Sequence, residues 1–327
     1  MTMKTSKVGR TVYPITIHLN HEIRSMNFYL YEDEESLMLI DGGFDSDETW
    51  KEFNKVLKAN NFKVGDIDKI LLTHHHPDHI GMVNRVLKIK DVPVYAHSSA
   101  IPRLNLDEES QLKRLAFFEK LYAEMECGKN GENYIEEMKR LKNSTVSKKF
   151  KVNAKIIPVA DQDKIGTLTV IETPGHSPDH VVFYDKKSKI LFGGDFLLSH
   201  ISSNAIIEPD VNGNRLQTLM QYIKSFNKLL KLDVDIIYPG HYKPIYNGHE
   251  LVESRLAGIV RKADEILEAI KLGYQTGNDL ALYFYKDKYE SEFELVLSEI
   301  IGHLDYLENK NKVNKVMKNR VWNYYSV

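Results

Sequence analysis

Residues 73–79 read Thr-His-His-His-Pro-Asp-His, and the rest of the chain is best interpreted around this stretch. Four of these side chains are potential metal ligands: His74, His76, Asp78 and His79. Neutral imidazole and carboxylate are the donors that suit divalent transition metals. Because side chains alternate along an extended segment, His74 and His76 would point to one side and His75 would face away. One short loop could therefore supply ligands to two adjacent metal sites.

The neighbouring sequence predicts a strand before this loop and a helix after it. Residues 69–73 are short and apolar, and Pro77 is followed by spaced apolar residues up to Leu87, which is typical of a helix start. Asp78 and His79 would then lie in the first helical turn, where free amides and the helix dipole favour an ionised carboxylate.

The composition is that of an ordinary soluble globular protein. The chain has 327 residues, of which 42% are hydrophobic and 28% charged, and its net charge is −2. This length predicts more than one domain, and the charge argues against a uniformly basic nucleic-acid-binding protein. No apolar block is long enough for a secretory signal or a membrane span. We therefore expect a cytoplasmic protein without membrane contact.

The single cysteine limits the type of metal site. Cys127 alone excludes an internal disulfide and a cysteine-rich zinc site, so any metal must be held by nitrogen and oxygen. Cys127 lies in a charged stretch with helical character, and we interpret it as a passive thiol.

The first 248 residues alternate predicted strands and helices, with one interruption. Strands are predicted over residues 11–19, 27–32, 36–40, 69–73, 92–96, 155–159, 168–172, 181–184, 189–192 and 234–238, and helices over 47–61 and 216–232. Residues 101–149 carry helical apolar stripes instead, which predict an inserted helical hairpin divided near Gly128–Gly131. The insertion either packs on the main body or forms a wall or lid over the site.

Five predicted strands end at a potential ligand or at a residue that could support one. These residues are Asp41, His74, His176, Asp195 and His241. Residues at strand ends along one sheet edge converge in space, and neighbouring glycines let the backbone approach a crowded centre. Among the other histidines, we expect His180 to support its loop and His97 to be structural. His200 is a candidate proton donor to the substrate.

Together these motifs resemble the metallo-β-lactamase fold superfamily. The matching residues, in chain order, are His74-x-His76-x-Asp78-His79, Thr173-Pro-Gly-His176, Gly194-Asp195 and Pro239-Gly-His241. The resemblance covers residues 11–248 and implies an α/β protein with an αββα sandwich, interrupted here by the helical insertion at about 101–150. It also implies a two-metal centre at one edge of the sandwich.

The resemblance implies a ligand assignment for the centre. His74, His76 and His176 would bind the first metal, Asp78, His79 and His241 would bind the second, and Asp195 would bridge them. Asp41 would support the ligands without binding a metal. The implied ions are two Zn²⁺, with Mn²⁺ or Fe as alternatives. Two metals about 3.5–4 Å apart can hold a hydroxide and polarise a substrate oxygen, with Asp78 and Asp195 as the catalytic carboxylates.

Two further features indicate branches of the superfamily. Asp195 stands where enzymes resembling the B1 β-lactamases carry cysteine, and an aspartate resembles the glyoxalase II, ribonuclease and lactonase branches instead. Residues 173–180 and the tail beyond residue 248 resemble the LACTB2-like subgroup (β-lactamase-like protein 2). That subgroup implies a small winged-helix-like domain over residues 249–327, following a catalytic domain over residues 1–248. In its expected turn Asn replaces Gly, and Asn tolerates a positive φ.

The leading hypothesis is a di-zinc hydrolase in which a metal-bridging hydroxide attacks a small ester or thioester, as similarity to glyoxalase II implies. The alternative is an endoribonuclease that cleaves single-stranded RNA, as similarity to the LACTB2-like subgroup implies. Residues 249–327 hold 11 Lys and Arg against 13 Asp and Glu, which favours the ester. A di-iron redox protein and a non-catalytic metal-stabilised scaffold are less favoured. The tail either packs on the catalytic domain or forms a dimer contact through Trp322, Tyr324 and Tyr325.

Overall fold

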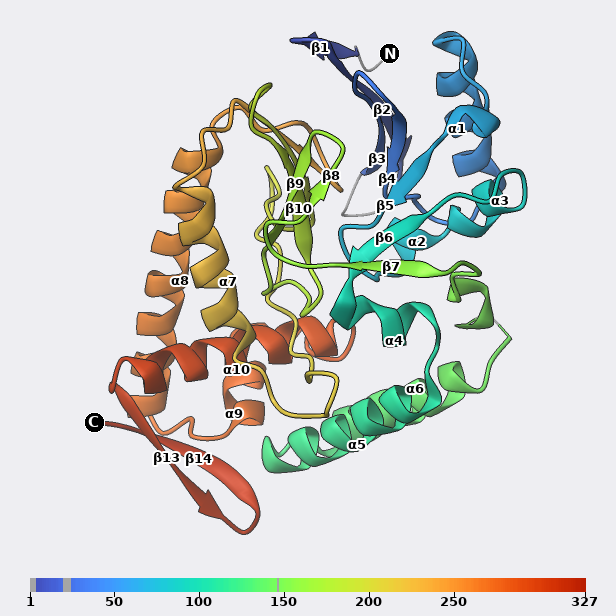
Figure 1. Cartoon of the computed structure of the whole chain (residues 1–327). Helices are drawn as coiled ribbons and strands as arrows, with labels where there is room; N and C mark the ends of the chain where they lie inside the picture. The colour runs from blue at the N-terminus through green and yellow to red at the C-terminus, as the bar shows by residue number, and fades with distance from the viewer. Residues whose placement is uncertain (1–3, 20–24, 146) are drawn as a thin grey trace.

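The body of the molecule is a sandwich of two β-sheets with helices against both outer faces (Figure 1). The computed structural model describes residues 4–19, 25–145 and 147–327. The first sheet has the order β1 (Thr5–Lys7), β2 (Arg10–His18), β3 (Ser25–Glu32), β4 (Leu37–Ile40), β5 (Lys69–Leu71), β6 (Val94–His97) and β7 (Ile156–Val159). The second has the order β12 (Ile236–Pro239), β11 (Ile190–Gly194), β10 (Val181–Asp185), β9 (Leu168–Glu172) and β8 (Lys164–Ile165). The predicted αββα architecture is confirmed.

Both sheets contain parallel and antiparallel strand pairs, and the length of the connection between two strands decides which type they form. In the first sheet β1 to β4 are antiparallel neighbours, and β4 to β7 pair in parallel. In the second sheet only the β11–β12 pair is parallel among the described residues. Parallel neighbours need crossover connections, which the intervening helices supply. The carboxyl ends of β4, β5 and β6 therefore lie at the same edge.

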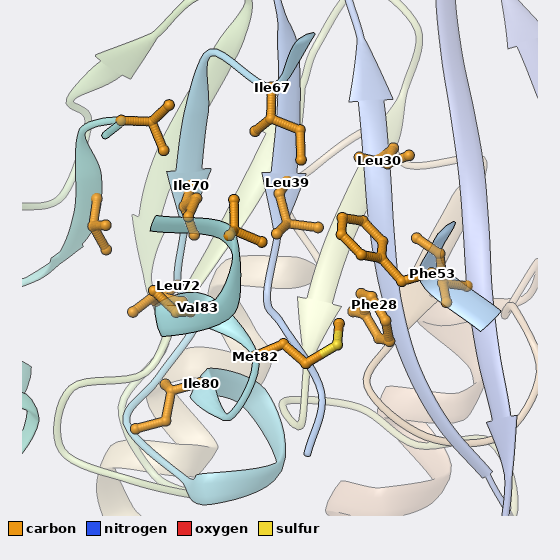
Figure 2. Packing of buried hydrophobic residues seen from close by; sticks show 14 of the residues in the cluster. Phe28, Leu30, Leu39, Phe53, Ile67, Ile70, Leu72, Ile80, Met82 and Val83 are labelled. Atoms are coloured by element: carbon orange, nitrogen blue, oxygen red, sulfur yellow. The ribbon is translucent and has the colours of Figure 1, made fainter. Parts of the chain in front are cut away.

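Strand side chains alternate between two apolar cores. On β3, Phe28 and Leu30 face α1 (Asp47–Ala59), α2 (Pro77–Ile80) and α3 (Val83–Leu87), where they pack in one cluster with Phe53 (Figure 2). Tyr29 and Tyr31 point the other way, into the core between the two sheets. Because both faces of β3 are buried, its sequence is a nearly continuous apolar run without strict alternation.

Local capping explains where α1 begins. The backbone N–H of Thr49 donates to Ser46 Oγ at 3.0 Å, and Asp47 and Glu48 occupy the first turn, where the helix dipole favours acidic side chains. Phe53 and Leu57 are buried on the face towards the sheet.

The second outer layer consists of α7 (Thr218–Leu229) and α8 (Gly248–Lys271). Tyr222 and Phe226 of α7 pack on Phe196, which follows β11, and Val252 of α8 joins the same core. Towards its other end α8 contributes Ala263 to a core shared with the insertion and the C-terminal elements. Because one helix enters both cores, the predicted domain division at residues 248/249 stays a prediction.

The helical insertion is present, but its two long helices separate earlier than predicted. It contains α4 (Ile101–Leu104), α5 (Glu108–Glu124), α6 (Gly128–Lys142) and a short 3₁₀ turn at Ser147–Phe150. Two further 3₁₀ turns, Val64–Asp66 and Ser98–Ala100, precede it in the chain. The break falls at Glu126, whose φ is +63°, and Gly131 lies inside α6. A Cβ at Gly131 would lie 2.9 Å from the Cβ of Tyr122. This glycine therefore permits close helix packing and does not mark a loop.

The C-terminal elements pack against the insertion. They are α9 (Gly277–Tyr285), α10 (Phe293–Asn309), β13 (Val313–Lys318) and β14 (Val321–Ser326). The hairpin after α10 corresponds to the predicted wing, and Asn311 in the preceding turn has a φ of +53°. Tyr324 is almost fully buried in the core shared with α5 and α6, so it packs within the chain. None of the helices of the described residues is both long and apolar enough to cross a membrane.

A buried carboxylate, Glu208, connects the insertion to the body. Arg103 Nη2 lies 2.5 Å from Glu208 Oε2, and Arg114 donates from Nε at 2.9 Å and from Nη2 at 2.5 Å. Burial alone would raise the pKa of the Glu208 carboxyl, but the two guanidinium groups lower the pKa from 4.5 to about 2. The ion-paired carboxylate therefore contributes stability above pH 4.5.

We expect this contribution to disappear in acid. Comparing wild type with Glu208→Gln in chemical denaturation at pH 7, the wild type should be more stable by up to about 3 kcal/mol, which corresponds to the pKa depression. As the pH falls from 4.5 towards 2 the folded carboxylate takes up its proton, and the difference in unfolding free energy should shrink. A difference that stays constant down to about pH 3 would contradict this role.

Candidate metal centre

Seven ligand-type side chains meet at one edge of the sandwich. One group is His74, His76 and His176, and the other is Asp78, His79, Asp195 and His241. Within each group the potential ligand atoms lie within 4.8 Å of one another. The residues follow β5, β9, β11 and β12, so strands from both sheets deliver them to the same place. All seven residues predicted from the sequence are thus brought together.

The first group has the spacing of ligands around one ion. His74 Nε2 lies 2.9 Å from His76 Nδ1, and His176 Nε2 lies 3.1 Å from the same atom. Three nitrogens at about 2.0–2.1 Å from a tetrahedral zinc ion would be roughly 3.3 Å apart. The three imidazoles therefore converge at nearly the separation that such an ion requires.

The Asp195 carboxylate lies between the two groups. Its Oδ1 is 3.4 Å from His79 Nε2, and its Oδ2 is 3.3 Å from His241 Nε2 and 3.6 Å from His176 Nε2. Asp78 completes the second group, with Oδ2 at 3.2 Å from His241 Nε2. Asp195, a member of the second group, thus also contacts His176 of the first, which is the position expected for a bridging ligand.

Backbone carbonyls set the orientation of two histidine rings. His176 Nδ1 donates to the carbonyl oxygen of Asn204 at 3.1 Å, and His241 Nδ1 donates to that of Ser25 at 2.8 Å. With the Nδ1 hydrogen used outside the centre, each neutral ring presents its Nε2 lone pair to the other ligands. Metal-ligating histidines are commonly held in this way.

Asp41 performs the same role for His79. Its carboxylate accepts hydrogen bonds from the Thr73 backbone N–H, the Thr73 hydroxyl and His79 Nδ1, each at 2.8 Å. The residue has a φ of +59°, an uncommon conformation for a side chain larger than glycine. Three donors thus fix the Asp41 carboxylate, in agreement with the supporting role predicted for it.

Replacing Asp41 with Asn should weaken metal binding without removing a ligand. Asn offers one acceptor oxygen in place of two, so it cannot satisfy the three donors, and His79 would lose its fixed orientation. We expect the affinity for a divalent cation to fall about 10–100-fold in competition with a chromophoric chelator. The exposed Asp264→Asn variant is the matched control, and equal affinities in the two variants would contradict the assignment.

Two buried polar atoms of the site lack a hydrogen-bond partner among the described residues, as expected of atoms that bind a cation. His79 Nε2 and Asp195 Oδ1 are buried and have no hydrogen-bond partner among the described residues. Leaving such a group unsatisfied costs about 1–3 kcal/mol. A Cβ at Gly240 would lie 2.5 Å from Asp195 Oδ1 and 2.6 Å from His79 Cε1, so this glycine keeps the space open. The residues fit divalent cations.

The charges of the site agree with that fit. Burial and neighbouring histidines lower the pKa of His74 and His76 well below the usual value, so these rings are neutral, as ligands must be. Burial would raise the pKa of Asp78, but neighbouring histidines lower it to about 2. Burial would lower the pKa of His241, but Asp195 raises it to about 10. The carboxylates thus favour positive charge here, which a bound cation would supply in place of these protons.

Two more residues of the motifs support the surrounding loops. His75 points away from the first group, with Nδ1 2.8 Å from the buried Asp179 carboxylate. His180 Nδ1 lies 2.9 Å from the Thr173 hydroxyl, and its Nε2 accepts the backbone N–H of Asp195 at 3.2 Å. The orientation of His75 and the supporting role of His180 agree with the sequence predictions. The role of Asp179 was missed, although it lies within the motif at residues 173–180.

The remaining histidines of the prediction lie outside both groups. His200 is exposed, and its ring contacts that of Tyr242 with the centroids 5.3 Å apart. His200 belongs to neither ligand group. His97 Nε2 lies 3.1 Å from the Glu172 carboxylate, which agrees with a structural role.

A pocket of about 200 Å³ lies between the loops that carry the ligands and the insertion, and none of the seven ligand-type residues lines it. On one side it is lined by His75 and Asp179, which neighbour ligand residues in the chain. On the other side it is lined by Arg103, Ser110 and Arg114 of the insertion. The insertion thus both packs on the C-terminal helices and supplies one wall of this pocket.

The chain is similar to several known proteins. The family model described as "Metallo-beta-lactamase superfamily" matches residues 23–241. The chain is 30% identical over 285 residues to the probable metallo-hydrolase YqjP of Bacillus subtilis (strain 168), covering 85% of this chain and 86% of that protein. It is 25% identical to the beta-lactamase-like protein 2 homolog of Drosophila melanogaster, covering 89% of this chain and 85% of that protein.

Two further comparisons concern an enzyme and a solved structure. The chain is 28% identical to the hydroxyacylglutathione hydrolase of Francisella philomiragia, covering 68% of this chain and 65% of that protein. The crystal structure of a metallo-beta-lactamase family protein from Thermus thermophilus superposes with a TM-score of 0.71 at 21% identity. That superposition covers 97% of this chain and 98% of the other, so the fold likeness extends beyond residue 241.

Proposed function

The chain belongs to the metallo-β-lactamase superfamily of hydrolases, and on this basis we propose that it uses two zinc ions to cleave a small ester or thioester. One observation carries the proposal. Seven ligand-type side chains converge from separate strand ends, and two of their atoms, His79 Nε2 and Asp195 Oδ1, are buried without a hydrogen-bond partner among the described residues. The similarity to a hydroxyacylglutathione hydrolase supports a thioester among the candidate substrates.

The residues of the centre would have separate roles in the reaction. Bound divalent cations would lower the pKa of a water molecule and polarise the carbonyl oxygen of the substrate. Asp195 would hold the two ligand groups together, because its oxygens face both of them. Asp78 is ionised and partly exposed, so it can accept the proton that the attacking water loses. The reaction adds one water across the C–O or C–S bond and releases an acid with an alcohol or a thiol.

His200 is the proposed proton donor to the leaving group. It is exposed beside Tyr242, the residue that follows the ligand His241 in the chain. A His200→Ala variant should lose turnover mainly with substrates whose leaving group is a poor one, such as an unactivated alkyl ester. An equal loss of turnover with good and poor leaving groups would contradict the role of His200 as proton donor.

The pocket between the ligand-bearing loops and the insertion would suit part of a small substrate. Its volume is about 200 Å³, and it is closed on one side by the insertion, with the Arg103 and Arg114 guanidinium groups in its wall. Polar contacts with this wall would orient part of a small substrate next to the loops that carry the ligands.

A second candidate is cleavage of single-stranded RNA, which one surface feature favours. In the β13–β14 hairpin the Lys315 ammonium lies 5.1 Å from the ring centroid of Trp322, and that of Lys318 lies 4.7 Å from the centroid of Tyr325. Lysines beside aromatic rings suit nucleic-acid binding. Lys315 is also paired with Glu308 at 2.9 Å, which reduces the net positive charge of the surface.

A substrate panel separates the candidates. The purified zinc-loaded protein should hydrolyse members of an acyl-thioester and ester panel and leave a single-stranded RNA oligomer intact. A chelator should stop turnover, and added zinc should restore it. Cleavage of RNA alone would reverse the preference, and bound iron with no hydrolytic turnover would favour a redox centre. The cytoplasmic location and the oligomeric state stay predictions.

A further inference from the structure

A second pocket, of about 240 Å³, lies beyond the metal centre between α7, α8 and α10. Its lining includes Tyr222 of α7, Arg255 and Arg261 of α8, His303 of α10, and Ser203. Ser203 Oγ lies 3.0 Å from His176 Nδ1, whereas His176 Nε2 belongs to the ligand group. The pocket therefore adjoins the outer edge of the His176 ring and is separate from the metal centre.

The two arginines of this pocket have no carboxylate partner among the described residues. Arg255 Nη2 donates to the carbonyl oxygens of Leu198 at 3.1 Å and Ile201 at 2.9 Å, while its Nε is buried without a partner. Arg261 is exposed and forms neither a hydrogen bond nor an ion pair within the described part of the chain. The acidic residue in the lining is Glu299. Two guanidinium groups facing one carboxylate favour an anionic ligand.

His303 supplies a hydrogen-bond acceptor in the same lining. It is only 2% exposed, and its Nδ1 donates to the backbone carbonyl of Glu299 at 2.8 Å. In the neutral ring the lone pair is therefore on Nε2, which is buried and has no partner among the described residues. Buried polar atoms in proteins normally have a hydrogen-bond partner. We therefore expect a ligand in the pocket to donate a hydrogen bond to His303 Nε2. The ligand should thus combine negative charge with a hydroxyl group.

We propose that this pocket binds a phosphate group, either as free phosphate or as a small phosphate monoester. Phosphate oxygens match the geometry of arginine side chains, and hydrogen phosphate also carries a hydroxyl that can donate to His303 Nε2. In a monoester the hydroxyl would come from the organic part. An ionised carboxylate offers acceptors alone and would leave His303 unsatisfied. The apolar wall, which includes Tyr222 and Ile259, would cover the organic part.

Isothermal titration of the zinc-loaded protein with inorganic phosphate and with glycerol 3-phosphate tests the proposal. The Arg261→Gln variant should bind these probes about tenfold more weakly than wild type, as expected for a lost charge-assisted hydrogen bond. Arg261 has no partner within the described part of the chain, so this variant should fold normally. Arg140→Gln, at an exposed position of α6, is the matched control and should bind like wild type.

The two probes distinguish the sources of the phosphate group. Tighter binding of glycerol 3-phosphate indicates a monoester, and tighter binding of inorganic phosphate indicates the free ion. Sulfate is the second arm, because it has the charge of hydrogen phosphate but no hydroxyl at neutral pH, and it should bind more weakly. Equal affinity for sulfate would overturn the phosphate assignment. Unchanged phosphate affinity in Arg261→Gln would place the ion elsewhere, including at the metal centre, and would overturn the site.

Discussion

An Asp78→Ala variant should fold like the wild type and lose hydrolytic turnover by about a hundredfold to ten-thousandfold. The substitution removes the carboxylate that lies 3.2 Å from His241 Nε2, and with it a ligand of the second group and the proposed acceptor of the water proton. Folding should survive because the carboxylate is partly exposed at the edge of the sandwich and carries none of the apolar core. The measurement is kcat on whichever ester or thioester the wild type hydrolyses best.

The control for this variant is Asp287→Ala. Asp287 is exposed and lies in a turn after α9, so its loss should change neither turnover nor folding. Circular dichroism and thermal unfolding of both variants show whether the fold is intact. Wild-type turnover in Asp78→Ala would remove Asp78 from the catalytic machinery.

A Gly81→Ala variant should be destabilised by about 3 kcal/mol or more, at the upper end of overpacking effects. An added Cβ would lie 2.3 Å from the backbone nitrogen of Asp45 and 2.6 Å from the carbonyl oxygen of Gly43. Backbone atoms cannot move aside as the end of a side chain can. The displaced loop also holds Gly42, whose N–H donates to the carbonyl of His79 at 2.6 Å, so metal affinity should fall as well.

Gly65→Ala is the matched control for this second variant. A Cβ at Gly65 has no heavy atom within 4 Å, and the residue does not have a positive φ. We expect its free energy of unfolding in a denaturant titration to stay within about 0.5 kcal/mol of wild type. Equal stabilities of the two variants would mean that the contact between the 42–45 loop and the helix after the histidines is not tight.

The ligand set was predictable because its signals are local. Every ligand lies shortly after the carboxyl end of a short apolar strand, in the loop and helical turn after β5 or in the loops after β9, β11 and β12. Residues at strand ends along one edge converge in space. The pattern of His74, His76, Asp78 and His79 can be read without knowledge of distant contacts. The same holds for Asp41, whose position at the end of β4 indicates its role.

Other contacts, both around the ligands and between the insertion and the body, were not predictable in the same way. Ser25 and Asn204 hold two ligand histidines through backbone carbonyls, and a carbonyl group has no signature in the sequence. Glu208 pairs with Arg103 and Arg114 across more than ninety residues, and charged residues are common enough that their pairing cannot be read from the chain. The start of α6 was placed too late because Gly131 serves helix packing.

The position of the metal ions tests the central claim most directly. In a crystal structure of the zinc-loaded protein, anomalous scattering at the zinc edge should show two peaks at the edge of the sandwich. One should lie about 2.0–2.1 Å from nitrogens of His74, His76 and His176, and the other should contact Asp78, His79 and His241, with Asp195 reaching both. Zinc bound elsewhere, or a single peak that leaves His241 and Asp78 without contact, would contradict the account.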